Sequence, residues 1–274
     1  MTVAAPAAPT TRTGPGLGSQ VRAEWTKISS ARALYIQLAL AVIVGIGISA
    51  LICVAVASSW DNLSPGQQID LHPITTSLGG VPFADIVLIV TGVTLVSSEY
   101  TSGMIRLTMT VTPNRLRVLF AKLVVIAAVT WAISLVIVLG SFVAGQAILA
   151  THAGVPTASL ADSDVQRAIL VAWLSAPLFP LIGAALGAIL RSTASAITTT
   201  LGLIFVPGIV GNLLPMWWQD HIITYFPSNA RSALLDTETN LSAHLSAPAA
   251  AITLVLWIVA SFAIASVLLR QRDV

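Results

Sequence analysis

The sequence predicts an all-α integral membrane protein with six transmembrane helices. The first observation is composition: of 274 residues, 56% are hydrophobic and only 9% are charged, whereas roughly 25% are charged in soluble domains. The second is that apolar stretches recur, each long enough to cross a hydrocarbon core that needs about 20 helical residues. The third is charge placement. With the N-terminus inside, all 13 Lys and Arg residues except Arg167 and Arg231 fall on the cytoplasmic side, as the positive-inside rule predicts.

The first 20 residues are expected to form a disordered cytoplasmic tail, followed by a single six-span transmembrane domain over 21–274. The tail consists largely of Ala, Pro, Thr and Gly, so it can bury little apolar surface. Both termini are expected in the cytoplasm, and the domain is expected in the plasma membrane.

A helix that lies in the membrane interface is expected over 21–32, just before the first span. Val21, Trp25 and Ile28 recur at i, i+4 and i+7, which places them on one face of a helix. Glu24 lies off that stripe. The residues assigned to this interfacial helix are Val21, Trp25, Lys27 and Ile28. The alternative is that these residues are only a basic flank to the first span.

The six spans are predicted from apolar length and from the proline pattern. They cover residues 33–57, 78–97, 119–150, 166–190, 196–214 and 248–269. The second is marginal, because it reaches about twenty residues only if Asp85 sits near its outer end. Pro177 and Pro180 are expected to kink the fourth span, and Pro207-Gly208 is expected to interrupt the fifth.

A polar stretch over 98–122 separates the second and third spans and is expected to contain a cytoplasmic coupling helix. Tyr100, Met104 and Leu107 recur at i, i+4 and i+7, so they would form the apolar face of a short helix. A second helix is expected to begin at 112–113, where a threonine precedes a proline. An amphipathic helix on the positive side of the membrane presents its apolar face to a partner.

Short helices in the outer leaflet are expected before the sixth span, within residues 215–247. Aromatic residues of the kind found at membrane interfaces gather there. Ser228 is expected to cap a short helix over 229–235. The residues assigned to this outer interface are Trp217, Trp218, Tyr225 and Phe226.

The chain shows no recognisable catalytic or metal-binding motif, so no catalytic residue and no metal ligand is assigned. Neither Lys27 nor Lys122 belongs to a GxxxxGK[ST] phosphate loop, which excludes ATP hydrolysis by that route. The four histidines lack metal-ligand spacing, and the single cysteine, Cys53, excludes a disulfide framework. Asp85 is either a proton carrier within the membrane or a solvated or capping group, and we favour the second interpretation.

Three stretches resemble the permease subunit of an ATP-binding-cassette exporter of the second type (ABC-2), especially permeases from high-GC Gram-positive bacteria. They are Ala23–Lys27 before the first span, Glu99–Arg106 after the second and Val118–Lys122 at the start of the third. The resemblance implies a connecting helix over 21–32 and a coupling helix over about 99–109. It also implies two permease halves that enclose a substrate path, with separate nucleotide-binding subunits beneath them.

The partners that this resemblance implies are ABC ATPase subunits, a second permease subunit that is identical or paralogous, and membrane lipids. ATP and magnesium are expected on the ATPase, with no cofactor in this chain and no nucleic acid. The residues assigned to ATPase coupling are Glu99, Tyr100, Met104, Arg106 and Leu107. Glu99 and Arg106 are expected to form charge pairs with the ATPase surface. The alternatives are an ion-driven transporter or channel, or an integral-membrane enzyme.

Overall fold

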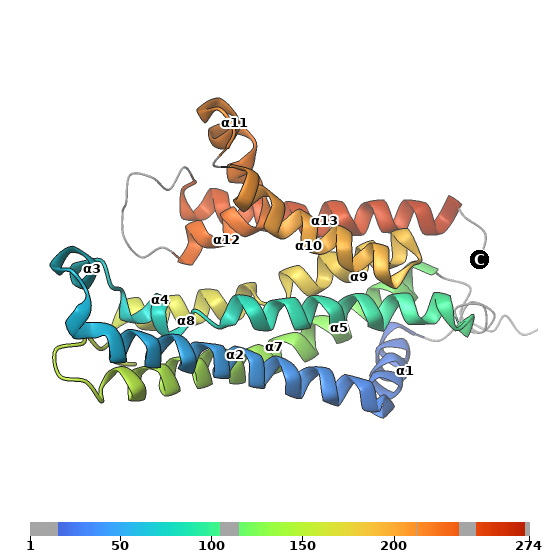
Figure 1. The fold of residues 1–274 in the computed structure, drawn as a ribbon. Coiled ribbons are helices and arrows are strands. Elements are labelled where there is room, and N and C mark those ends of the chain that lie inside the picture. The colour runs from blue at the N-terminus through green and yellow to red at the C-terminus, as the bar shows by residue number, and fades with distance from the viewer. Residues whose placement is uncertain (1–15, 105–114, 212, 236–244, 272–274) are drawn as a thin grey trace, which may run out of the picture.

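The computed structural model describes residues 16–104, 115–211, 213–235 and 245–271, and the elements in these ranges are helices. Six of them, counting α8 and α9 as one span, are long and apolar enough to cross a membrane. They run side by side as an elongated bundle (Figure 1). The expected fold class is therefore confirmed.

The spans are formed by six long segments. These are α2 (Arg32–Ser59), α5 (Val81–Thr101), α7 (Arg115–Leu149), α8 with α9 (Ser163–Ser175 and Leu178–Leu190), α10 (Thr193–Gly211) and α13 (Ala247–Gln271). Shorter helices flank them: α1 (Leu17–Ser30), α3 (Pro65–Ile69), α4 (Pro73–Ser77), α11 (Met216–His221) and α12 (Pro227–Leu235), with 3-10 turns η1 (Trp60–Asn62) and η2 (Ile223–Tyr225).

The bundle has two ends, each named here after a helix that lies at it. The α1 end carries α1, the C-terminal end of α5, the start of α7 and the end of α13. The α12 end carries α3, α4 and α12 (Figure 1).

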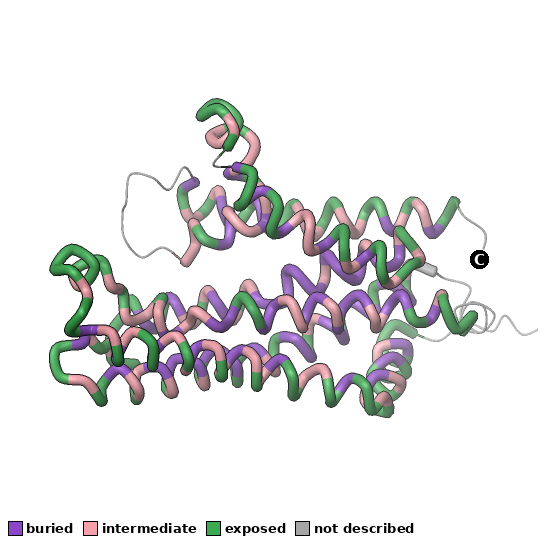
Figure 2. Tube along the Cα trace, viewed as in Figure 1, coloured by how far each residue is buried: buried purple, intermediate pink, exposed green. Residues whose placement is uncertain are grey.

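The outer faces of the spans carry large apolar side chains, as expected of a surface that meets lipid. Ile43 and Leu51 of α2 are each 68% exposed, and Ile209 of α10 is 70% exposed. Burial concentrates instead on α5 and on the span formed by α8 and α9 (Figure 2). These two spans form the centre around which the others pack.

Small residues allow α5 and α9 to approach closely. A Cβ added to Gly92 would lie 2.4 Å from the Pro180 carbonyl oxygen, a distance that carbon and oxygen do not tolerate without a shift. On the facing helix, a Cβ on Gly183 would meet the Val93 side chain at 3.0 Å. Any side chain on Gly92 would therefore push the two central spans apart.

Prolines affect two spans differently. The fourth span breaks between Ser175 and Leu178, which confirms the kink expected at Pro177, because a proline ring clashes with the preceding helical turn. The expected interruption of the fifth span is wrong. α10 continues through Pro207 to Gly211, since a membrane helix can lose one backbone hydrogen bond without ending.

The N-terminal helix differs from its prediction in both bounds and orientation. α1 begins at Leu17, so residues 17–20 are helical rather than part of the expected tail, and residues 1–15 lie outside the described ranges. Its buried face is Gln20, Glu24 and Ile28, and Trp25 is 51% exposed. The prediction that Glu24 lies off the buried face of this helix is therefore wrong, because Glu24 faces the protein.

The expected coupling helix also differs where the structure describes it. Glu99 and Tyr100 belong to the last turn of α5, which ends at Thr101, and Gly103 then adopts the left-handed conformation with φ 72°. Tyr100 and Met104 therefore do not share a helix face. Helical spacing identifies a face but not where the helix ends. Residues 105–114, which include Arg106, Leu107 and the helix start expected at 112–113, lie outside the described ranges.

Candidate functional site

Four charged side chains meet at the α1 end and form what we name the charge cluster: Glu24 and Lys27 of α1, Glu99 of α5 and Lys122 of α7. Lys122 Nζ lies 2.8 Å from Glu24 Oε2 and 2.7 Å from Glu99 Oε1. Lys27 Nζ lies 2.8 Å from Glu24 Oε1 and 3.4 Å from Glu99 Oε1. One lysine therefore joins three helices, and the second reinforces the same two carboxylates.

The cluster is buried and electrically balanced. The side chains of Lys122 and Glu24 are each 5% exposed and that of Glu99 is 10% exposed, whereas Lys27 is 35% exposed. Two positive and two negative charges cancel, which is the condition under which charges are tolerated away from water. Among the described residues Glu99 Oε2 has no hydrogen-bond partner.

The pKa values of Glu24 and Lys27, the two cluster residues on α1, are shifted by their partners in the cluster. Burial alone would raise the pKa of Glu24, but the charge and hydrogen bond of Lys122, together with those of Lys27, outweigh it and lower that pKa. Burial alone would lower the pKa of Lys27, but the Glu24 hydrogen bond and the Glu99 charge raise it. Both groups are therefore held in their charged forms.

Apolar side chains close off the cluster. Ile28 of α1, Leu34 of α2, and Val125 and Val129 of α7 form one buried group beside it. Val125 and Val129 lie one and two helical turns after Lys122, so the same face of α7 supplies both the ammonium and the apolar packing. Packing and ion pairs together hold α1 against α7 and the end of α5.

Tyr100 faces the interior of the bundle and not an outer surface. It packs against the buried group that contains Leu119 and Leu123 of α7. The Arg191 guanidinium carbon lies 5.5 Å from the centre of its ring. Glu99 and Tyr100 thus both have partners within the chain, whereas the contact of Glu99 with an ATPase surface stays a prediction. Met104, at 46% exposure, is accessible.

The aromatic residues assigned to the outer interface lie on α11, η2 and the turn after it. Trp217, Trp218 and Tyr225 are 59%, 45% and 49% exposed, as the prediction of an interfacial position requires. The Phe226 ring packs 5.9 Å from the Trp257 ring of α13, and Trp257 Nε1 donates a hydrogen bond to the Tyr225 carbonyl at 2.8 Å. The segment is therefore anchored to the last span. The short helix after it starts at Pro227, one residue before the expected cap Ser228.

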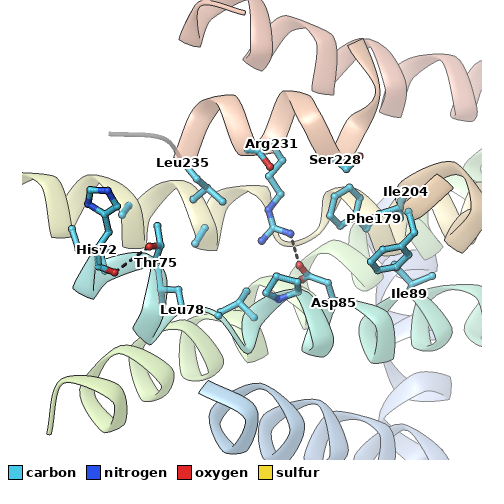
Figure 3. A pocket seen from close by; sticks show the side chains of 18 of the residues that line it. His72, Thr75, Leu78, Asp85, Ile89, Phe179, Ile204, Ser228, Arg231 and Leu235 are labelled. Atoms are coloured by element: carbon cyan, nitrogen blue, oxygen red, sulfur yellow. Dashed lines mark hydrogen bonds and ion pairs between the residues drawn. The ribbon is translucent and has the colours of Figure 1, made fainter. Parts of the chain in front are cut away.

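A second polar feature lies towards the α12 end, inside a cavity of about 500 Å³ between α4, α5, α8, α9, α10 and α12 (Figure 3). Asp85 of α5 and Arg231 of α12 point towards each other across it and form an ion pair. Arg231 Nε also donates to Ser175 Oγ at 3.0 Å, and its guanidinium carbon lies 5.2 Å from the centre of the Phe179 ring. Asp85 is 4% exposed. The expectation that it is solvated or capping is therefore wrong.

Both ion-pair sites went unrecognised in the sequence because their members lie far apart in it. Glu24 is separated from Lys122 by 98 positions, and Asp85 from Arg231 by 146. One signal was present. A charge within a span needs a partner, and Arg231 was one of only two basic residues assigned to the outer side.

Comparison with protein families decides the class of protein. The model of the ABC-2 family transporter protein matches residues 74–274. The chain belongs to the ABC-2 transporter family. This ABC-2 protein is accordingly a multi-pass membrane permease of an ABC-type transporter. Members of the family are membrane transport components, and membership implies an ABC ATPase partner. A comparison with curated proteins gave no significant match.

The match covers Asp85, Glu99, Lys122 and Arg231 but begins after α1 and α2. Glu99 and Lys122 therefore lie in the part of the chain that matches the family model, whereas Glu24 and Lys27 lie in the segment before it.

Proposed function

We propose that this chain is the permease subunit of an ABC exporter, and that the charge cluster passes movements of an ATPase subunit into the transmembrane helices. The observation that carries the proposal is the joining of three elements by Lys122. It contacts Glu24 of α1 and Glu99 of α5 from its own position on α7. α5 ends and α7 begins at this same end of the bundle (Figure 1).

The coupling follows from the stiffness of the contact. A force on the connection between α5 and α7 acts on the ends of both helices. Since removal of one member of a buried ion pair costs about 3–5 kcal/mol, the cluster resists separation. α1, α5 and α7 then move together. A tilt of α5 reaches α9 through the close contact of the two helices at Gly92.

The α1 end is assigned to the cytoplasm on charge. Arg22, Arg32 and Arg191 lie there together with the cluster lysines, in keeping with the positive-inside tendency.

ATP and magnesium bind to the separate ATPase subunits, and two permease subunits, identical or paralogous, enclose the substrate path. Exposed Met104, just after the end of α5, is the described residue best placed to touch the ATPase.

Co-purification tests this assignment. A tagged chain is purified from its own cells in mild detergent, and the ATPase recovered with it is identified by mass spectrometry and by ATP hydrolysis. Met104→Asp is expected to lower ATPase recovery, because it places a charge in an apolar contact. Met216→Asp is the matched control, since Met216 is 73% exposed on α11, and it is expected to leave recovery unchanged. Equal recovery by wild type and both variants would contradict the assignment.

A further inference from the structure

The cavity at the α12 end has the form of a small-molecule site. Its volume of about 500 Å³ falls within the range of roughly 300–1,000 Å³ typical of such sites. Most of its wall is apolar, with Ile89, Phe179 and Ile204 contributed by three different spans (Figure 3). A minority of the lining residues have polar or charged side chains, and a minority of placed polar groups is the pattern that fixes the orientation of a mainly apolar ligand. These residues are His72, Thr75, Asp85, Ser228, Arg231 and Ser232.

The ion pair determines the charge of a ligand that fits. Asp85 and Arg231 neutralise each other, and both are buried, at 4% and 6% exposure. A ligand with a net charge would add an uncompensated charge to an apolar enclosure, which is strongly unfavourable. A ligand without net charge keeps the balance.

A hydroxyl group supplies a further polar contact. Ser228 lies in the first turn of α12 and lines the cavity, and its Oγ is buried without a hydrogen-bond partner among the described residues. A buried hydroxyl normally has a partner. A hydroxyl or carbonyl group on a ligand would provide one.

We propose that this cavity binds an amphiphile without net charge, whose apolar body contacts the spans and whose polar group reaches Ser228 and the Asp85–Arg231 pair. The site is built within one chain, whereas the proposed transport path lies between two permease subunits. The same chemistry is available from an uncharged bilayer lipid and from an exported compound, and the experiment separates these sources.

Photo-cross-linking with three matched probes tests the site in membranes that contain the full chain. The probes share one diazirine-bearing acyl chain and differ only in the head group: glycerol without charge, carboxylate, or trimethylammonium. The glycerol probe is expected to label peptides from α5 or α12, with half-maximal labelling at a concentration at least about 100-fold lower than for either charged probe. Equal labelling by all three would overturn the proposal.

Charge variants provide the sharper test. Asp85→Asn leaves Arg231 uncompensated and is expected to shift the preference to the carboxylate probe. Arg231→Gln leaves Asp85 uncompensated and is expected to shift it to the ammonium probe. The double variant restores neutrality and the glycerol preference, so it also guards against loss of folding in the single variants. A folded single variant that keeps the glycerol preference, or a folded double variant in which the glycerol probe no longer leads, would overturn the proposal.

Filling the cavity gives an independent measurement. Thr75 lines the rim and is exposed, so Thr75→Trp is expected to reduce glycerol-probe labelling at least about tenfold, as loss of a good apolar contact does. Ile69→Trp, at a position of α3 that is 80% exposed and outside the cavity lining, is the control. Labelling that survives Thr75→Trp unchanged would contradict binding in the cavity.

The source of the ligand is resolved by adding ATP and magnesium to membranes that also hold the ATPase subunit. Labelling that falls during ATP hydrolysis shows that the probe leaves the site in the transport cycle, as an exported compound would. Constant labelling shows that the site keeps its ligand, as expected of a bound bilayer lipid. Either result supports the site. Only this last step rests on the proposed function, because the probe and variant measurements need no ATPase.

Discussion

Replacing Lys122 by Met is the perturbation that the charge cluster predicts to be most damaging. The change leaves Glu24 and Glu99 together with a single lysine, Lys27, which is 35% exposed and lies 3.4 Å from Glu99. One buried negative charge is then uncompensated. The expected loss of stability is about 3–5 kcal/mol, which corresponds to a fall of about 10 °C in Tm for a chain of this size.

Thermal unfolding in detergent, followed by loss of the monodisperse peak in size-exclusion chromatography, measures this change. Arg22→Met is the matched control, because Arg22 is exposed on α1 and its loss is expected to cost no more than about 0.5 kcal/mol. The double variant Lys122→Met/Glu99→Gln restores neutrality and is expected to recover at least half of the lost Tm. A double variant less stable than Lys122→Met alone would refute the reasoning from charge balance.

Three further predictions concern pH, packing and the outer segment. Because the pKa of Glu24 is lowered, its contribution to stability is present above the usual value of 4.5 and is lost as pH falls through the folded pKa. Because the pKa of Lys27 is raised, its contribution to stability is present below 10.5 and is lost as pH rises through the folded pKa. Tm measured against pH should therefore fall more steeply at acid pH for wild type than for Glu24→Gln. Gly92→Ala should destabilise by about 1–3 kcal/mol through overpacking against Pro180, whereas Gly47→Ala, where a Cβ meets nothing within 4 Å, should not, and equal Tm values for the two would contradict the packing account. Trp257→Phe removes the hydrogen bond to the Tyr225 carbonyl and should lower the free energy of unfolding by about 1 kcal/mol. It should also increase protease cleavage in the segment that holds α11. Unchanged cleavage would show that this hydrogen bond does not anchor the segment.

The spans were predictable because the signal that defines them is local. Apolar length alone identifies a segment such as Arg32–Ser59, and a proline ring breaks a helix through its own turn, as at Pro177. The helix bounds were less predictable. Leu17 starts α1 within a stretch whose composition indicated disorder, and Thr101 ends α5 although the apolar spacing continues past it.

The sites were less predictable than the spans because they depend on which helices meet. Glu24 was placed off the apolar stripe, since a carboxylate is normally solvated, and only the position of Lys122 on α7 makes its burial favourable. Asp85 was noticed as a charge within a span, but its partner Arg231 comes from α12, a short helix 146 positions later in the chain. A rule that each buried charge requires an opposite one would have restricted the search to very few candidates.

The orientation of the α1 end is the claim on which ATPase coupling depends, and cysteine labelling measures it most directly. The only native cysteine, Cys53, is buried, so Cys53→Ala provides a background in which Met104→Cys and Met216→Cys are introduced singly. A membrane-impermeant maleimide is then applied to intact cells and to opened membranes. The account predicts that the cysteine at position 216 reacts in intact cells, and that the one at position 104 reacts only after the membranes are opened. Labelling of position 104 in intact cells would contradict the account.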